Sequence, residues 1–586
     1  MAKNKNTEKE VNTAQRLSSI VKTCRDIMRK DRGLNGDSDR LPMLTWLMFL
    51  KFLDDMEIMQ ETEAQLAQQT YKPLIKEPYR WRDWAKNTGL SGDDLLAFIN
   101  NEEIILANNE KSAGLLYYLR QLQSINGADR RDVIATVFRG VNNRMVSGYL
   151  LRDVINKIDE IHFTSNDEIF TLSHLYESLL KEMRDSAGDA GEFYTPRPVV
   201  KFIVEIMNPK IGETVLDPAC GTGGFLVEAF DFMKKQATSK ETFDILQQKS
   251  IYGGEAKPLP FLLSQMNLLL HGLEFPQISF GNSLSKKLTE IGDNERVDII
   301  ITNPPFGGEE ENSVVKSFSL ENKTSETALM FLQLIMRKLK REKPNQKGGR
   351  AAVVVPNGVL FGDGISARIK EQLTKDFNLH TIVRLPEGIF APYTGIPTNL
   401  LFFTEGEATK NIWYYQIKIK DGRKNYTKTN PIQFEEFDEL IKWWNNRTET
   451  ENTWKIDFAT LLSQANAKAD IHRKIAKDSE TKIAKNKEKI DTLEKQLQTE
   501  ENKKEKAKTA EEIDKLKTKN EELKKIVTTE KQTAENIYYA VFNLDFKNPA
   551  QNTEIVHLEP EILLQNVIDK ETKILNLLNE LKTEFN

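Results

Sequence analysis

The feature that most constrains the fold is an alternation of short β-branched runs with amphipathic stretches between Ser173 and Thr404. β-branched residues favour strands, and the stretches between them repeat apolar residues at helical spacing. Such alternation predicts an α/β domain whose parallel sheet carries helices on both faces and binds ligands at the carboxyl ends of its strands. The predicted strands are TVLD from residue 214, SIYG from 250, QISF from 277, VDIIIT from 297, AAVVVP from 351, TIVRL from 381 and TNLLFF from 398.

At 586 residues the chain is too long for one hydrophobic core, because single domains hold roughly 100 to 200 residues. Clustered apolar residues predict a helical N-terminal domain at 1–165, followed by the α/β domain at 166–405. A mixed connecting segment at 406–475 leads to a charged coiled-coil hairpin at 476–535, and a helical tail that could dock a partner follows at 536–586.

The hairpin segment is rich in Lys and Glu and has apolar residues at coiled-coil spacing. Asn520 falls at an a position, where a polar residue fixes the register at some cost in stability. Each arm has few heptads, so two solvated single helices or a disordered spacer remain alternatives. The tail from Pro560 carries an apolar stripe, which packs more often on its own protein than on another. The a and d positions are Ile483, Ile490, Leu493 and Leu497 in one arm and Ile513, Leu516, Asn520, Leu523 and Val527 in the other.

Composition excludes several classes of protein. Cys24 and Cys220 lie too far apart in the sequence for a disulfide framework, and the first residues lack the apolar core of a signal peptide. The most apolar stretch, Leu41 to Asp55, is shorter than the ~20 residues that cross a membrane. The spacing of His and Cys residues predicts no metal site. We therefore expect a cytoplasmic protein, and its net charge of −5 means that contacts to nucleic acid are local or shared with a partner.

The aromatic string YRWRDWA at 79–85 interleaves arginine with tryptophan. One interpretation is a surface that stacks on bases or on a protein partner. The other is a packed satellite cluster, and the pattern alone does not choose between them.

A glycine-rich turn follows the first predicted strand. Gly221, Gly223 and Gly224 let the backbone approach a ligand closely and leave the N–H groups of the next helix free to donate. The dinucleotide fingerprint needs glycine where this chain has Leu226, and the Gly-Lys-Ser/Thr of a P-loop is absent. Phosphate cradles are therefore disfavoured, and an adenosine ligand without phosphates fits better.

Two acidic residues stand at neighbouring strand ends. Glu255 ends the second predicted strand, where an acid can accept hydrogen bonds from two ribose hydroxyls. Its alternative role is a helix N-terminal acid that stabilises the helix dipole. Asp217 can face a ligand ammonium group or a backbone amide.

The sequence NPPF at 303–306 follows the strongly apolar run VDIIIT. Two prolines stiffen the backbone and push Asn303 toward an extended conformation. The side-chain oxygen of Asn303 and the carbonyl of Pro304 could accept both hydrogens of an aromatic amine and draw its nitrogen toward a tetrahedral form, while Phe306 stacks on the base. The plainer alternative is an ordinary Asn-Pro turn at a strand end.

Together these motifs resemble those of the DNA N6-adenine methyltransferases. FYTP at 193–196 is similar to their cofactor motif, DPACGTGGF at 217–225 to their S-adenosylmethionine loop, and NPPF to their catalytic tetrapeptide, in the order of the gamma group. GEFYTPRPVV, LMFLKFLDD and NLDFKNP further resemble the modification subunit of type I restriction-modification systems. The resemblance implies a Rossmann-like S-adenosylmethionine-dependent methyltransferase sheet.

Carried over residue by residue, the resemblance implies an adenine site formed by Asn303, Pro304, Pro305 and Phe306. The family often has Asp where this chain has Asn282, whose amide can still bond adenine N6 or N1. The implied contacts to S-adenosyl-L-methionine are Glu192, Phe193, Tyr194, Thr195, Pro196, Arg197, Asp217, Gly221, Thr222, Gly223, Gly224, Glu255 and Asn282.

The resemblance implies methyl transfer from S-adenosyl-L-methionine to N6 of adenine in double-stranded DNA, which protects host DNA. It implies two copies of this chain for each specificity subunit and a separate ATP-driven restriction subunit, which agrees with the absent P-loop. The residues leave two alternatives open. One is a glutamine N5 protein methyltransferase, since NPPF serves any planar amide-like nitrogen, and the other is a non-catalytic scaffold.

Overall fold

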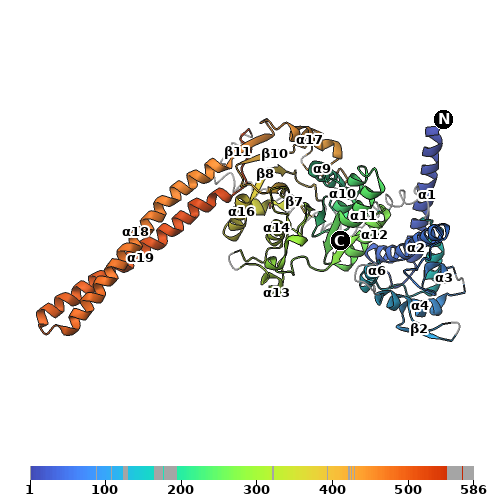
Figure 1. The fold of residues 1–586 in the computed structure, drawn as a ribbon, viewed down its shortest axis with the longest axis horizontal. Coiled ribbons are helices and arrows are strands. Elements are labelled where there is room, and N and C mark those ends of the chain that lie inside the picture. Colours follow the sequence, from blue (N-terminus) through green and yellow to red (C-terminus); the bar gives the residue numbers. More distant parts are fainter. Residues whose placement is uncertain are drawn as a thin grey trace.

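The computed structural model describes residues 2–86, 89–106, 109–122, 130–163, 176, 195–319, 322–391, 394–419, 423, 425–427, 429–550 and 571. Figure 1 shows a group of N-terminal helices, a central sheet covered by helices, and a long two-helix hairpin. The N-terminal helices and the hairpin lie at opposite ends of the molecule, with the sheet between them.

The N-terminal region is helical and packs around α2, whose residues from Met43 to Leu50 are all buried. A helix that is buried all round needs neighbours on every side. α12 (Pro258–Leu270) of the central region supplies part of that cover through Phe261, Leu263 and Met266. The elements of the region are α1 (Ala2–Met28), α2 (Asp37–Leu66), α3 (Trp81–Trp84), α4 (Gly92–Asn100), β1 (Glu103–Ile105), β2 (Lys111–Ala113), α5 (Leu115–Arg120), α6 (Arg130–Arg139) and α7 (Gly148–Asp159).

The aromatic string at 79–85 is a packed cluster, the second of its two interpretations. Tyr79, Trp81 and Trp84 are buried, and Trp81 Nε1 donates to Asp159 Oδ1 at 2.8 Å. Arg82 Nε lies 2.7 Å from Asp54 Oδ1. Buried rings cannot stack on bases, so this string stabilises the N-terminal core.

Within the described residues, a nine-stranded sheet has the order β11-β10-β8-β9-β7-β6-β3-β4-β5. All seven runs predicted to be strands are strands. Ile299 and Ile301 of β6 pack in one apolar cluster and Ile300 in another, the alternation of a strand buried on both faces. The strands are β3 (Val215–Asp217), β4 (Ile251–Glu255), β5 (Gln277–Phe280), β6 (Ile299–Thr302), β7 (Arg350–Pro356), β8 (Phe377–Arg384), β9 (Thr398–Glu405), β10 (Asn411–Gln416) and β11 (Thr453–Asp457).

The expected parallel sheet also contains antiparallel strands, all in one half of it. β9 runs antiparallel to both β7 and β8, and β11 runs antiparallel to β10. A parallel return from β8 to β9 would need a crossover, usually a helix, and the described part of their connection contains none. β10 and β11 also extend the sheet beyond residue 405, into the segment expected to be a connector.

Helices cover both faces of the sheet, as expected for this α/β arrangement. α9 and α10 pack on one face, and α14 and α16 on the other. Besides α12, the helices of this region are α9 (Arg197–Met207), α10 (Gly224–Lys234), α11 (Lys240–Lys249), α13 (Asn312–Val315), α14 (Thr327–Lys338), α15 (Asn357–Phe361), α16 (Ile365–Asp376) and α17 (Asp438–Asn445). The 3-10 turns are η2 (Leu288–Glu290), η3 (Asp293–Glu295), η4 (Phe434–Phe437) and η5 (Ala540–Phe542).

The projecting hairpin consists of α18 (Phe458–Thr499) and α19 (Lys503–Tyr539), so it is longer at both ends than the expected 476–535. Asn520 is buried in the seam, where its Oδ1 accepts a hydrogen bond from Asn486 Nδ2 at 2.9 Å. Ion pairs between the arms flank the seam, for example Lys489–Glu512 at 2.6 Å. Apart from residue 571, the tail predicted from Pro560 lies outside the described residues.

Candidate active site

The sheet order brings three of the predicted site residues to one edge. β3 lies between β6 and β4 and runs parallel to both. The carboxyl ends of these strands carry Asp217, Glu255 and, directly after β6, Asn303. Because these strands are parallel neighbours, the glycine turn, the acid and the NPPF segment meet at the same edge.

The glycine turn needs glycine at two positions because of its backbone conformation. Gly221 has a φ of +53° and Gly223 a φ of +78°, a left-handed region that other residues rarely adopt. At Gly224 a Cβ atom would lie 2.6 Å from Arg197 Nη1, the end of a flexible side chain that can move aside. The turn leads directly into α10, and Thr222 is buried within it.

Asp217 is buried and accepts two hydrogen bonds at Oδ1. Ala219 N donates at 3.1 Å, and Thr302 Oγ1 donates at 2.6 Å. The sequence left open whether Asp217 faces a ligand ammonium group or a backbone amide, and the structure shows the backbone amide of Ala219. Burial raises the pKa of Asp217 from 3.8 to about 7, because the charged form loses its hydration.

Glu255 links the glycine turn to the helix that follows β4. Its Oε2 accepts from Gly221 N at 2.9 Å, and its Oε1 accepts from Lys257 N at 2.8 Å. Burial also raises the pKa of this carboxyl group. Each carboxylate oxygen can accept a further hydrogen bond, so these contacts leave capacity for a ligand hydroxyl.

Asn303 is held by a residue of the FYTP motif. Its Nδ2 donates to Thr195 Oγ1 at 3.1 Å. Among the described residues nothing donates a hydrogen bond to Asn303 Oδ1, which is buried. A buried acceptor without a partner costs about 1–3 kcal/mol, and its place beside the glycine turn and Glu255 distinguishes Asn303 Oδ1 from the other buried atoms of this kind in the described residues.

The remainder of NPPF shapes the surroundings of Asn303. Pro304 is buried and Pro305 is exposed. Phe306 is partly buried and packs edge to face against Phe390, with ring centroids 5.8 Å apart. Phe390 belongs to the connection between β8 and β9, so that loop forms one wall beside NPPF.

Asn282 lies just beyond β5, at the same edge but with its amide already engaged. Its Nδ2 donates to Glu310 Oε2 at 3.0 Å, and its Oδ1 accepts from Leu284 N at 2.9 Å. The adjacent Ser283 Oγ donates to the carbonyl of Pro218 at 2.7 Å, which ties this loop to the glycine turn.

Some predicted residues cannot be placed, and some contacts escaped sequence reasoning. Glu192, Phe193 and Tyr194 lie outside the described residues, whereas Thr195, Pro196 and Arg197 lead into α9. The contact of Thr302 with Asp217 was missed. The sequence does indicate this contact, because Asp217 and Thr302 each end a predicted strand and the two strands are neighbours in the sheet.

The described residues hold neither a cluster of metal ligands nor a helix that could cross a membrane. In the part of the chain that the structure describes, no group of three His, Cys, Asp or Glu residues could hold a metal ion. None of the described helices combines the length and apolarity needed to cross a membrane.

Comparisons with known proteins agree with the motifs. The N-6 DNA Methylase family profile matches residues 167–490, and the HsdM N-terminal domain profile matches 17–158. The methylase subunit of the type I restriction enzyme EcoEI from Escherichia coli is 46% identical over 459 residues, which cover 76% of this chain and 88% of that protein.

Two solved structures extend the match to the fold. A chain from Vibrio vulnificus YJ016, described as the modification subunit of a type I restriction enzyme, is 62% identical with a TM-score of 0.70, covering 76% of this chain and 93% of its own. A chain from a study of type I restriction-modification assembly is 34% identical with a TM-score of 0.66, covering 96% of each chain. The chain therefore belongs to the N-6 DNA methylase family, among the modification subunits of type I restriction-modification systems.

Proposed function

We propose that this chain transfers a methyl group from S-adenosyl-L-methionine to N6 of adenine in double-stranded DNA, within a type I restriction-modification complex. The observation that carries the proposal is the buried, unpartnered Oδ1 of Asn303 at the carboxyl end of β6. Because Asn303 Oδ1 accepts no hydrogen bond from the described residues, it can accept one from the N6 amino group of adenine, which has two N–H donors.

The residues around the glycine turn fit S-adenosyl-L-methionine. Its adenosine carries no phosphate, which matches a turn that has neither fingerprint for a phosphate cradle. Glu255 keeps acceptor capacity for ribose hydroxyls, and α10 begins at the turn with its N–H groups toward the same edge. The other proposed contacts are Asp217, Gly221 to Gly224, Asn282 and the EFYTPR segment from Glu192 to Arg197. When bound, the sulfonium group supplies an electrophilic methyl carbon.

Asn303 and Pro304 act on the adenine. The Asn303 Oδ1 accepts one N6 hydrogen and the Pro304 carbonyl accepts the other, which concentrates electron density on the nitrogen. Phe306, already braced by Phe390, stacks on the base. In a duplex N6 is paired and shielded, so the adenine must first leave the helix. Holding the flipped base in contact with the methyl donor contributes much of the acceleration.

For the assembly around this chain we take the type I restriction-modification relatives as the guide. We propose that two copies of this chain join one specificity subunit, which reads the DNA site, and that a separate restriction subunit supplies ATP-driven translocation. The net charge of −5 and the absent P-loop support this division of labour. The hairpin and the tail at 560–586 are the candidate docking elements, and we propose a cytoplasmic location.

Two alternatives fare worse. A glutamine N5 protein methyltransferase would share NPPF, yet the relatives reported above are DNA methylase subunits and the HsdM N-terminal profile covers the helical domain. A non-catalytic scaffold would have no reason to keep the Asn303 acceptor, the glycine turn and Glu255 together at the carboxyl ends of neighbouring strands.

A tritiated-methyl assay tests the proposal. Full-length chain, alone and with its neighbouring specificity protein, is given unmethylated duplex DNA and, separately, protein extract. We expect label in DNA that acid hydrolysis recovers as N6-methyladenine, and no label with Asn303→Ala. Label in protein glutamine, or none under any condition, would overturn the proposal.

A further inference from the structure

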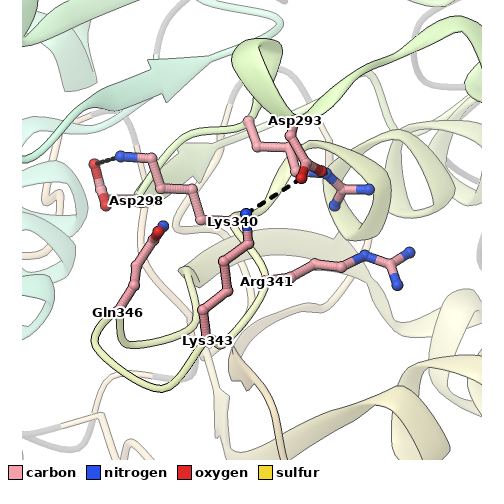
Figure 2. Close-up of a pocket in the computed structure, with 7 residues that line it drawn as sticks. Asp293, Asp298, Lys340, Arg341, Lys343 and Gln346 are labelled. Carbon is pink, nitrogen blue, oxygen red and sulfur yellow. Dashed lines mark hydrogen bonds and ion pairs between the residues drawn. The ribbon is translucent and has the colours of Figure 1, made fainter.

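Figure 2 shows a small cavity. It lies at the amino ends of the strands, whereas the candidate active site lies at their carboxyl ends. Its volume is about 230 Å³. Asp298 directly precedes β6 and Lys340 precedes β7, whereas Asn303 follows the other end of β6. The cavity is therefore separate from the proposed methyl-transfer site. Its lining consists of Asp293, Arg296, Asp298, Lys340, Arg341, Lys343 and Gln346.

The cavity carries more positive than negative charge, with four cationic and two acidic lining residues. Both acids are already paired. Lys340 Nζ lies 2.6 Å from Asp298 Oδ2, and Lys343 Nζ lies 3.3 Å from Asp293 Oδ2. Among the residues that the structure describes, no carboxylate pairs with Arg341. An uncompensated guanidinium therefore remains at the cavity.

A second arginine strengthens the positive field. Arg296 is only 7% exposed, and its Nε shares Asp293 with Lys343. Burial, followed by the charges of Arg337 and Arg341, lowers the pKa of Arg296. Arg337 donates to the carbonyls of Leu288 and Ile291 rather than to an acid. Like charges gathered this way repel one another, and a bound anion would relieve that repulsion.

The excess charge is local to one segment. RKLKREKPNQKGGR at 337–350 has seven Lys or Arg residues and one acid, while the whole chain has a net charge of −5. A basic run of this density has two interpretations. It can contact a polyanion, or it can be a solvated surface, which is the more frequent case. Here the run folds around a cavity, which favours the binding interpretation.

We propose that this cavity binds a phosphate group through Arg296, Arg341 and Lys343, because Lys340 reaches to Asp298 on the opposite side of the cavity (Figure 2). Arg and Lys are the side chains that most often bind phosphate in proteins. The volume is below the ~300 Å³ at which pockets for drug-sized ligands begin, so one or two linked phosphate groups fit and a whole nucleotide does not. The phosphate comes from the backbone of duplex DNA or from a free phosphate-bearing compound. The proposal is independent of methyl transfer.

Calorimetry and DNA binding together test the proposal, using the full-length chain and two matched variants. Arg341→Ala removes the uncompensated cation, and Lys347→Ala removes another exposed cation of the same loop that does not line the cavity. We expect inorganic pyrophosphate to bind the wild type and Lys347→Ala alike, and Arg341→Ala about tenfold more weakly, the loss of one charge-assisted hydrogen bond.

The salt dependence of duplex binding identifies the source. If the phosphate belongs to DNA, the slope of log K against log salt should fall by about one for Arg341→Ala and stay unchanged for Lys347→Ala. Weaker pyrophosphate binding with an unchanged slope supports a free phosphate compound. Equal behaviour of the two variants in both measurements overturns the proposal. Neither readout uses methylation, and circular dichroism checks that both variants fold.

Discussion

Asn303 Nδ2 donates a hydrogen bond to Thr195 Oγ1 at 3.1 Å, which joins the NPPF segment to the residue that precedes Pro196. The two residues are 108 positions apart in the sequence. This contact fixes the amide of Asn303 while its Oδ1 stays buried and unpartnered. Thr195 is thereby placed to orient the proposed acceptor.

Replacing Thr195 by Val should remove this orientation at constant size. We expect kcat to fall about tenfold, the value of one hydrogen bond, while the affinity for S-adenosyl-L-methionine changes little. Thr195→Ser keeps the hydroxyl and should restore most of the rate. Steady-state kinetics and calorimetry separate the two effects. An equal loss of cofactor affinity would instead show that the hydroxyl of Thr195 serves its proposed contact with the cofactor and does not orient Asn303.

Asn303→Ala should abolish methylation without unfolding the protein. Truncation removes an oxygen that has no partner among the described residues and one hydrogen bond to Thr195, so the free energy of unfolding should fall by no more than about 1–2 kcal/mol. Denaturant unfolding and cofactor binding are the measurements. A large loss of stability together with cofactor binding would mark Asn303 as structural.

Asp217 should make stability depend on pH. Its folded pKa of about 7 lies above the unfolded value of 3.8, so the folded state holds the proton more tightly. This stability is fully present below the unfolded pKa and is lost as pH rises through the folded pKa. At roughly 1.4 kcal/mol per pKa unit, the loss is at most about 4 kcal/mol.

Asp217→Asn mimics the protonated carboxyl group and removes this dependence. Relative to the wild type, the variant should gain stability between pH 5 and pH 8. Urea midpoints at both pH values measure the difference. A constant difference across that range would show that Asp217 keeps an ordinary pKa in the folded protein.

The Asn486–Asn520 pair should act as a register device in the hairpin. Asn520→Leu leaves the Asn486 amide without its partner and should destabilise the hairpin by roughly 1–2 kcal/mol. The double change to Leu should recover that loss while weakening the preference for one register. Hydrogen exchange of the α18 and α19 amides in the full-length chain reports both effects. Equal protection in the single and double variants would contradict this role.

The sequence predicted the strands well because their signals are local. β-branched runs such as VDIIIT need no knowledge of their neighbours to be recognised, and parallel order then places Asp217, Glu255 and Asn303 at one edge. Strand direction is different, because it depends on how the chain returns. The antiparallel β9 therefore differs from expectation although its seven-residue pairing with β7 is extensive.

Other features depend on contacts between distant residues. Neither Thr195 with Asn303 nor Arg341 with Arg296 leaves a pattern in the sequence, since each pair meets only after the sheet forms. The sequence does not show whether Trp81 and Trp84 are exposed or buried, because that depends on which distant residues pack against them. The site residues assigned by resemblance stay predictions until a ligand is bound.

The position of α12 ties the two halves of the protein together. This helix begins three residues after Glu255, and its Phe261, Leu263 and Met266 belong to the N-terminal core. If the chain were cut near residue 166, each of the two fragments would expose leucine and phenylalanine side chains that are buried in the intact protein. The helical half and the methylase half should melt in a single step, and proteases should fail to release either as a stable fragment.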